Sequence, residues 1–297
     1  MNVILEIVWA VVSVSAGFLR SAPDYESGLD SQLLMGSVVR IDSTDRYWCH
    51  VQAMEPEYRG WINELQLSVI PSDSVDAYIA APKYICIEDV TRVWSEPSLQ
   101  SDRLSEVVLG DLLRKGGETQ GRFAKVVLPD GRAGWMLRSC VADFSAWAGS
   151  VTPSPDSVEA IARSLMGTPY MWGGTSVKGV DCSGLTRLAY FMNGILLPRD
   201  TSKQVKTGEA VPLDMESWRK GDLLFFGSSP SKVSHVAIYL GEGKIIQSSE
   251  IVRVNSLVPG EADCYEKSPV AVRRIIGVRD SGCSPATVRE CKWYFPQ

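Results

Sequence analysis

The feature that most constrains the fold is an internal repeat in the first half of the chain. Pro23, Gly36 and the pair Gly60-Trp61 recur 74 positions later, as Pro97, Gly110 and Gly134-Trp135. Each copy contains short stretches of alternating apolar residues separated by turn-forming residues, which is the pattern of antiparallel strands. We therefore predict two successive small β-barrels of about 65 residues each, within residues 1–70 and 71–147.

These landmarks resemble bacterial SH3 (SH3b) domains, which have an Arg-x-x-Pro-like opening and a closing Gly-Trp followed by an apolar residue. The first copy carries Arg20-Ser-Ala-Pro23 and Gly60-Trp61-Ile62, and the second copy has Trp94 in place of Arg20. The resemblance implies two SH3-like barrels. The alternative is that both barrels are structural spacers.

Composition excludes several classes of partner. The net charge of −5 argues against nucleic acid and favours a small or neutral ligand. The first twenty residues are apolar but contain Glu6 and lack a basic start, so we predict a leading strand of the first barrel. No run approaches the roughly 18 charge-free apolar residues of a membrane span.

A third region, residues 148–297, begins where small and turn-forming residues mark a linker. We predict a helix that Asp156 and Glu159 cap, and a second helix from Cys182 to Asn193 that Asp181 caps. Strand-like runs follow at 222–226, 235–240, 244–247 and 270–276. Helices followed by an antiparallel sheet indicate an α+β domain.

Cys182 is the candidate nucleophile of this domain. As the first residue of a helix it would face unpaired N–H groups and the helix dipole, which favour a thiolate. Gly173, Gly174 and Gly179 let the chain approach closely and leave room for a substrate backbone. The alternative is a structural cysteine.

A thiol nucleophile needs a base, and the chain has only two histidines. His50 lies within a predicted barrel strand, whereas His235 opens an apolar strand directly after Ser234. By elimination, His235 is the candidate base.

Gln247 is the candidate orienting residue. A three-residue turn at 241–243 would pair Leu240 with Lys244 and place Gln247 on the same sheet face as His235. Its amide oxygen would accept the outer ring N–H and fix the tautomer. The alternative is an exposed polar side chain.

We expect no metal and no cofactor. The seven cysteines form no Cys-x-x-Cys pair, and two histidines offer few ligands for zinc. Cys283 and Cys291 would close a short disulfide loop in an oxidising compartment.

Five motifs of the third region resemble those of NlpC/P60 cysteine peptidases, in the same order. They are Tyr170-Met-Trp172-Gly-Gly174, Asp181-Cys182-Ser183-Gly184, Leu197-Pro-Arg199, Gly221–Phe226 and His235–Tyr239. The resemblance implies a papain-like α+β catalytic domain that cleaves the γ-D-glutamyl bond to a diamino acid in peptidoglycan stem peptides. Cys182 would match the nucleophile and His235 the base. Gln247 departs from the family, which commonly has His there.

The resemblance also implies a substrate groove. Tyr170 would help the Cys182 N–H to bind the oxyanion, and the residues matching Asp181 and Ser183 would bind polar ends of the peptide. Trp172, Thr201 and Ser234 would line the same groove.

Family members with two SH3b domains trim freed peptides that carry an N-terminal L-Ala, and their first SH3b domain holds the free amine. Tyr58 matches the tyrosine of that site, and the second copy has Arg132 there. The matching acidic position is Gly28, a departure. The expected partner is L-Ala-γ-D-Glu-diaminopimelate, bound by a monomer.

Three alternatives stay open: a lysin that acts on intact peptidoglycan, a catalytically impaired wall-binding protein, and an acyltransferase on the same fold. We expect an exported protein of the periplasm or envelope whose export signal is absent from this chain. The cytoplasm is the alternative compartment.

Overall fold

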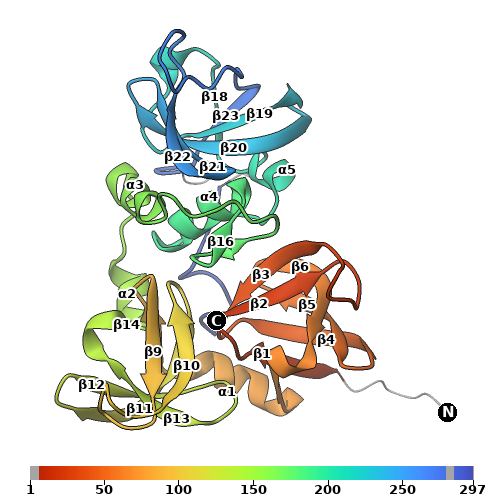
Figure 1. Ribbon diagram of the computed structural model, residues 1–297, viewed down its shortest axis with the longest axis vertical. Coiled ribbons are helices and arrows are strands. Elements are labelled where there is room, and N and C mark those ends of the chain that lie inside the picture. Colours follow the sequence, from red (N-terminus) through yellow and green to blue (C-terminus); the bar gives the residue numbers. More distant parts are fainter. Residues whose placement is uncertain (1–6, 279–283, 297) are drawn as a thin grey trace. The chain divides into compact units, whose positions relative to one another are not determined.

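The computed structural model describes residues 7–278 and 284–296 (Figure 1). Contacts divide them into two compact units, 7–150 with 291–296, and 151–278 with 284–290. The boundaries predicted at residues 70 and 147 stay a prediction. The predicted disulfide involves Cys283, which lies outside the described residues. Among the described residues, no helix is long and apolar enough to cross a bilayer.

The first sheet has seven antiparallel strands in the order β3-β2-β6-β5-β4-β1-β7. The strands are β1 (Val8–Val12), β2 (Ala16–Arg20), β3 (Leu29–Leu34), β4 (Val38–Asp45), β5 (Trp48–Met54), β6 (Glu57–Asn63) and β7 (Leu67–Ile70). The predicted leading strand exists as β1, but the same stretch also contains β2, because the chain leaves the sheet between them. There the Ser13 N–H donates to the Gln66 carbonyl instead of to a strand. Residues 1–6 of this stretch lie outside the described residues.

The second sheet repeats this arrangement in the order β10-β9-β13-β12-β11-β8-β14. Its strands are β8 (Lys83–Cys86), β9 (Val90–Trp94), β10 (Arg103–Val108), β11 (Leu112–Gln120), β12 (Phe123–Val127), β13 (Ala133–Leu137) and β14 (Val141–Asp143). Adding seven to each label of the first sheet gives the second. Gly36 and Gly110 adopt nearly the same left-handed φ, 91° and 89°. The sequence repeat is therefore also a structural repeat.

Each barrel has an apolar core, the second of which also includes Met35 of the first copy, and Asp111 bonds to both copies. Its carboxylate accepts the backbone N–H of Met35 from the first copy and that of Val108 from the second, both at 2.8 Å. The side chain is fully buried, and this burial raises its pKa. Helix α1 (Val75–Ala80) connects the two sheets, and α2 (Phe144–Ser150) follows the second.

The last residues of the chain pack against the barrels. The Trp293 ring lies 5.6 Å from the Trp9 ring, and the Phe295 ring stacks on Phe144 at 5.0 Å. These contacts place residues 291–296 in the first unit. No sequence pattern predicts this pairing of distant aromatic residues.

The second unit is an α+β domain whose six-stranded antiparallel sheet has the order β18-β23-β19-β20-β21-β22. Its strands are β18 (Glu209–Val211), β19 (Leu223–Ser229), β20 (Lys232–Gly241), β21 (Lys244–Ser249), β22 (Ile251–Ser256) and β23 (Ala271–Arg274). Two further two-stranded sheets pair β15 (Thr175–Ser176) with β16 (Gly179–Val180) in a hairpin, and β17 (Ile195–Leu196) with the distant β24 (Ala286–Thr287). The helices are α3 (Pro155–Ser164), α4 (Cys182–Phe191) and α5 (Thr201–Gln204).

The predicted cap of α3 was wrong. Ser154 is the N-cap and its hydroxyl accepts the Ser157 N–H, while the Ser157 hydroxyl accepts the Ser154 N–H. Pro155 occupies the first helical position, where its fixed φ suits a helix and its missing N–H costs nothing. The helix therefore begins before Asp156.

The hairpin of β20 and β21 agrees with the prediction along its length but not at its tip. Ile238 pairs with Ile246, as the predicted register requires, whereas Gly241 rather than Leu240 pairs with Lys244. A bulge absorbs the difference, so that the turn contains only Glu242 and Gly243, at φ 51° and 70°. Two left-handed residues are typical of a tight hairpin turn.

Candidate active site

The first residue of α4 is Cys182, as the sequence predicts. Asp181 caps the helix in an extended conformation, and its Oδ1 accepts the Gly184 N–H at 2.7 Å. All residues of α4 are buried, and Cys182 is only 7% exposed. Figure 1 places α4 against β20 and β21 of the sheet.

Glycines allow the hairpin of β15 and β16 to pack on this helix start. A Cβ at Gly184 would lie 1.9 Å from the Gly174 carbonyl oxygen, and a Cβ at Gly174 would lie 2.3 Å from that of Gly179. These distances exclude any side chain at either position. The predicted close approach therefore exists, between two parts of the backbone.

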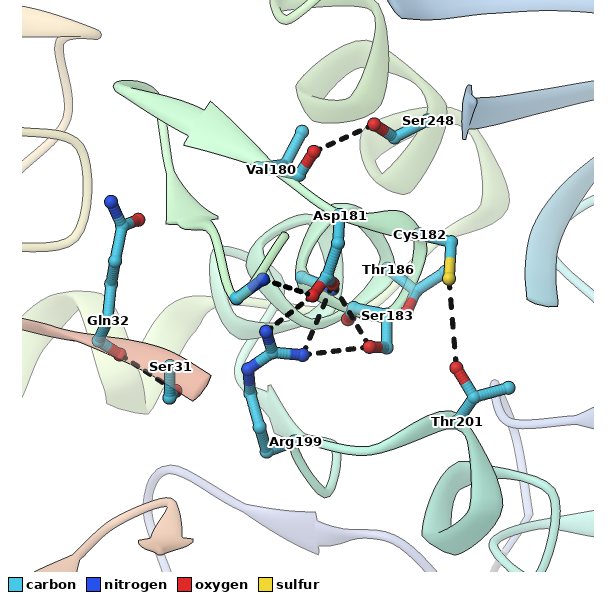
Figure 2. A network of polar contacts seen from close by, with 12 residues as sticks. Ser31, Gln32, Val180, Asp181, Cys182, Ser183, Thr186, Arg199, Thr201 and Ser248 are labelled. Atoms are coloured by element: carbon cyan, nitrogen blue, oxygen red, sulfur yellow. Dashed lines mark hydrogen bonds and ion pairs between the residues drawn. The ribbon is translucent and has the colours of Figure 1, made fainter. Parts of the chain in front are cut away.

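The N-cap residue, Asp181, is one member of a buried ion pair. The guanidinium of Arg199 donates to both oxygens of Asp181, at 2.5 Å and 3.2 Å, and to the Ser183 hydroxyl at 2.8 Å (Figure 2). The Gly173 N–H also donates to the Asp181 carboxylate. The resemblance predicts that Asp181 and Ser183 bind polar ends of the peptide. In the structure their side-chain oxygens already accept hydrogen bonds from Arg199 and Gly173. Arg199 was missed as a site residue, although it belongs to the Leu-Pro-Arg motif.

Gln204 holds the Arg199 segment against α4. Its amide nitrogen donates to the carbonyls of Ser183, at 3.0 Å, and Pro198, at 2.9 Å. Its amide oxygen accepts from the Thr186 hydroxyl at 2.8 Å. The same segment brings the Thr201 hydroxyl to 3.8 Å from the Cys182 sulfur, as Figure 2 shows.

The pKa of the Cys182 thiol is raised, chiefly because the sulfur is buried and also because the Asp181 charge is close. The hydroxyl of Thr201 and the backbone N–H groups of Val236 and Ser183 act in the opposite direction. The N–H donors at the helix start thus favour a thiolate, as the sequence predicts, but the pKa of the buried thiol is raised overall. Loss of hydration outweighs the donors at the helix start.

The contact with the Val236 N–H places the middle of β20 beside the sulfur, and His235 is the residue before Val236. The His235 Nε2 lies 2.5 Å from the Gln247 Oε1, which is the contact that the sequence predicts. Because an amide oxygen only accepts, Nε2 carries the proton and Nδ1 is left as an acceptor.

Asn255 fixes the orientation of the Gln247 amide. The Gln247 Nε2 donates to the Asn255 Oδ1 at 2.8 Å, and the Asn255 Nδ2 donates to the Asp263 carbonyl at 2.9 Å. A backbone carbonyl thus determines which way Asn255 points, and Asn255 in turn determines which atom of Gln247 faces the imidazole. Gln247 and Asn255 are buried, so this chain of amides is closed to solvent.

Burial lowers the pKa of His235, and the positive charge of Lys267 lowers it further. The hydrogen bond to Gln247 opposes this shift. Both shifts thus favour the uncharged forms, a neutral imidazole and a protonated thiol.

Two other predicted residues differ in exposure. Tyr170 is half-buried, and burial together with the charges of Cys182 and Asp181 raises its pKa to about 12, so its hydroxyl keeps its proton. Trp172 is 69% exposed. Both precede the start of α4 in sequence.

The remaining predicted residues lie on strands. Ser234 is exposed on β20, next to His235. Tyr58 belongs to the other unit, where it lies half-buried on β6 against the core of the first barrel. His50 is also in that barrel, with its ring 5.1 Å from the Trp61 ring.

Tyr265, which the sequence reasoning missed, lies beside the candidate base. Its ring centre is 6.0 Å from that of His235 and 5.1 Å from that of Phe226. Burial raises the pKa of Tyr265, and the charge of Cys182 raises it further. Within the residues that the structure describes, no cluster of three or more His, Cys, Asp or Glu side chains suits a metal ion.

Two family models match the chain. Residues 167–274 match the NlpC/P60 family, and residues 19–67 match the bacterial dipeptidyl-peptidase Sh3 domain. The first match contains Cys182, His235 and Gln247, and the second contains Tyr58.

Similar proteins cover most of the chain. The γ-D-glutamyl-L-lysine dipeptidyl-peptidase of Bacillus cereus is 30% identical over 257 residues, which cover 84% of this chain and 75% of the relative. Dipeptidyl-peptidase 6 of Lysinibacillus sphaericus is 28% identical over 260 residues, covering 84% and 91%. The crystal structure of an NlpC/P60 family protein from Bacillus cereus has a TM-score of 0.76 and 26% identity, and the match covers 90% of this chain and 99% of that one.

Proposed function

Because the chain belongs to the NlpC/P60 peptidase family, we propose that it is a cysteine endopeptidase that hydrolyses the bond between γ-D-glutamate and the diamino acid of peptidoglycan stem peptides. The observation that carries this proposal is the position of the middle of β20, at His235 and Val236. It brings the Val236 N–H to the Cys182 sulfur and holds His235 in one tautomer through Gln247. This arrangement supports a nucleophile, a base and an orienting residue.

The reaction begins with transfer of the thiol proton to the His235 Nδ1 as the Cys182 sulfur attacks the γ-carbonyl carbon. The free site holds a neutral thiol, so the proton moves during attack and no thiolate is needed beforehand. The imidazolium then protonates the leaving amine, and a thioester remains. A water that loses its proton to His235 hydrolyses the thioester and restores the thiol.

The oxyanion of each tetrahedral intermediate lies at the start of α4. The backbone N–H of Cys182 and the hydroxyl of Tyr170 are the proposed donors, and the raised pKa of Tyr170 suits it to donate. The Asp181–Arg199 pair positions the helix start, because it caps α4 and is itself buried. Thr201, Trp172 and Ser234 contribute to the surrounding groove, whereas the buried Ser183 hydroxyl supports the Asp181–Arg199 pair.

We propose that the substrate is a freed peptide with an N-terminal L-Ala rather than intact wall. Two relatives are named dipeptidyl-peptidases. Such an enzyme cleaves the bond that follows the second residue from a free N-terminal amine. The match to the bacterial dipeptidyl-peptidase Sh3 domain includes Tyr58, the proposed contact for that amine. We propose an envelope or exported protein, with the cytoplasm as the alternative.

One experiment separates the candidates. The protein is incubated with L-Ala-γ-D-Glu-diaminopimelate, with the same peptide N-acetylated, and with whole sacculi, and products are followed by mass spectrometry. We expect cleavage of the first substrate alone, and none by the Cys182→Ala variant. Cleavage of sacculi would replace the freed-peptide proposal with a wall lysin. A folded protein that cleaves none of the three would overturn the peptidase proposal.

A further inference from the structure

A pocket of about 710 Å³ opens between the segment that joins β22 to β23 and the short helix at Met215–Ser217. Its apolar wall includes Trp218 and Leu257, and Tyr265 forms one edge. Its polar rim contains one basic and two acidic side chains, Lys267, Glu261 and Glu266. The pocket therefore combines an apolar wall with both signs of charge.

The pocket begins beside the candidate base. The Tyr265 ring lies 6.0 Å from the His235 ring, and the Lys267 Nζ lies 5.9 Å from the Tyr265 ring centre. The electrostatic effect of Lys267 on the His235 pKa agrees with this placement. His235, Tyr239 and Phe226 alternate onto the same sheet face, whose apolar cluster includes Trp218 and Tyr265.

The wall of the pocket is built into the fold. The Tyr265 N–H donates to the Ser256 carbonyl at 2.7 Å, and the Asp263 carbonyl accepts from Asn255. Cys264 forms a bridge with Ser256. The segment that carries the charged rim is thus anchored to β22, the strand that also supplies Asn255 to the amide chain behind His235.

The proposed reaction indicates which part of the substrate lies nearest to this pocket. His235 must contact the leaving nitrogen to protonate it, so the leaving diamino acid lies on the His235 side of the sulfur. The pocket edge at Tyr265 is the part of the pocket nearest to that side. The distal end of diaminopimelate carries a carboxylate and an ammonium group, whereas lysine ends in an ammonium group alone.

We propose that this pocket binds the side chain of the leaving diamino acid and selects diaminopimelate over lysine, with Lys267 pairing with the distal carboxylate. Glu261 and Glu266 are placed to face the distal ammonium group, and Trp218 and Leu257 contact the methylene groups. A lysine side chain would place its ammonium group at the same acidic side chains and would leave Lys267 without a carboxylate partner. The inference rests on the proposed function, since it assumes cleavage before a diamino acid.

The test compares L-Ala-γ-D-Glu-diaminopimelate with L-Ala-γ-D-Glu-L-Lys as substrates of the full chain. We expect kcat/KM to be at least about tenfold higher for the diaminopimelate peptide. Lys267→Gln should remove most of that preference by lowering kcat/KM for this peptide alone, and Lys267→Glu should reverse it. Lys206→Gln, at an exposed lysine outside the pocket lining, serves as the matched control and should change neither value.

Binding of free diaminopimelate to the Cys182→Ala variant, measured by NMR, tests the pocket without catalysis. We expect saturable binding that the additional Lys267→Gln substitution weakens. Cleavage of both peptides with equal kcat/KM, or equal loss for both in Lys267→Gln, would overturn the inference and leave the proposed function intact. Binding without cleavage of either peptide would support the pocket and reject the peptidase.

Discussion

The nucleophile side and the base side of the candidate site use opposite kinds of polar contact. Around Cys182, a buried carboxylate and a buried guanidinium pair at 2.5 Å, in Asp181 and Arg199. Behind His235, only neutral amides follow one another, from Gln247 to Asn255. A pair of charged side chains thus fixes the start of α4, and neutral amides orient the His235 imidazole, which must exchange a proton.

The difference has a physical reason. A carboxylate beside an imidazole raises the pKa of the imidazole. An amide oxygen also fixes the tautomer, but it raises that pKa less. His235 thus keeps a lowered pKa and remains neutral as a base. The Asp181 charge would by contrast raise the Cys182 pKa more strongly if Arg199 did not pair with it.

Breaking the charged side should have the largest effect. Arg199→Met leaves the Asp181 carboxylate buried without its partner, so we expect a loss of about 3–5 kcal/mol in the free energy of unfolding and no measurable cleavage. Urea unfolding followed by circular dichroism measures the first, and peptide hydrolysis the second. The double variant Asp181→Asn/Arg199→Met should recover part of the stability, because the unpaired charge is gone.

Arg163→Met is the matched control for that loss. Arg163 pairs with Glu159 on the surface of α3, where it is 46% exposed. Exposed pairs contribute about 0–1 kcal/mol, so this variant should stay within that range. Equal costs for both arginines would contradict the contrast between the two sides.

Breaking the neutral side should affect the rate more than the stability. Gln247→Ala removes the acceptor of the Nε2–H, so the imidazole loses its fixed tautomer, and we expect kcat to fall about 10²-fold with little change in KM. Steady-state kinetics on the diaminopimelate peptide measure both. An unchanged kcat would show that Gln247 does not orient His235.

Gln247→Glu sharpens the comparison, since it brings a full charge to the base side. The carboxylate still accepts the Nε2–H but stabilises the imidazolium, which raises the pKa of His235. The acid limb of the kcat/KM profile should therefore move to higher pH. A profile that does not move would mean that residue 247 lies outside the proton-transfer path.

The pH dependence of the wild-type protein tests the neutral pair directly. A protonated imidazole cannot accept the thiol proton, so kcat/KM should rise with pH through the lowered His235 pKa, below its ordinary value of 6.5. The thiolate should appear only above the ordinary thiol pKa of 9.0. The rate of alkylation by iodoacetamide across pH, with Cys182→Ser as the blank, measures it. A thiolate near neutral pH would favour a preformed ion pair.

Local patterns predicted much of this architecture. The repeat anchored by Gly36 and Gly110 predicted two similar barrels, because strand alternation and left-handed glycines are local properties. The body of the β20–β21 hairpin brought Gln247 to His235 as expected, since register follows from the turn and the alternation.

Contacts that depend on tertiary packing could not be predicted from the sequence. The raised Cys182 pKa depends on how much water the surrounding elements exclude, and no spacing encodes that. The partner of Asp181 lies 18 residues away in Arg199, within a recognised motif that gave no indication of its target. Asn255 and Tyr265 come from a strand and a loop whose positions only the sheet order reveals.

Asn255 should give the smallest effect, because it acts on His235 only through Gln247. Asn255→Ala removes the acceptor of the Gln247 Nε2 and lets the amide turn over, so we expect kcat to fall about fivefold to tenfold, or roughly 1 kcal/mol, with the acid limb unchanged. Asn193→Ala is the control, since Asn193 is also buried and donates to the Ala189 carbonyl at 2.8 Å at the end of α4. Both variants should lose similar stability, but only Asn255→Ala should lose rate. Equal kinetic losses would reduce Asn255 to a structural residue and end the chain of orienting amides at Gln247.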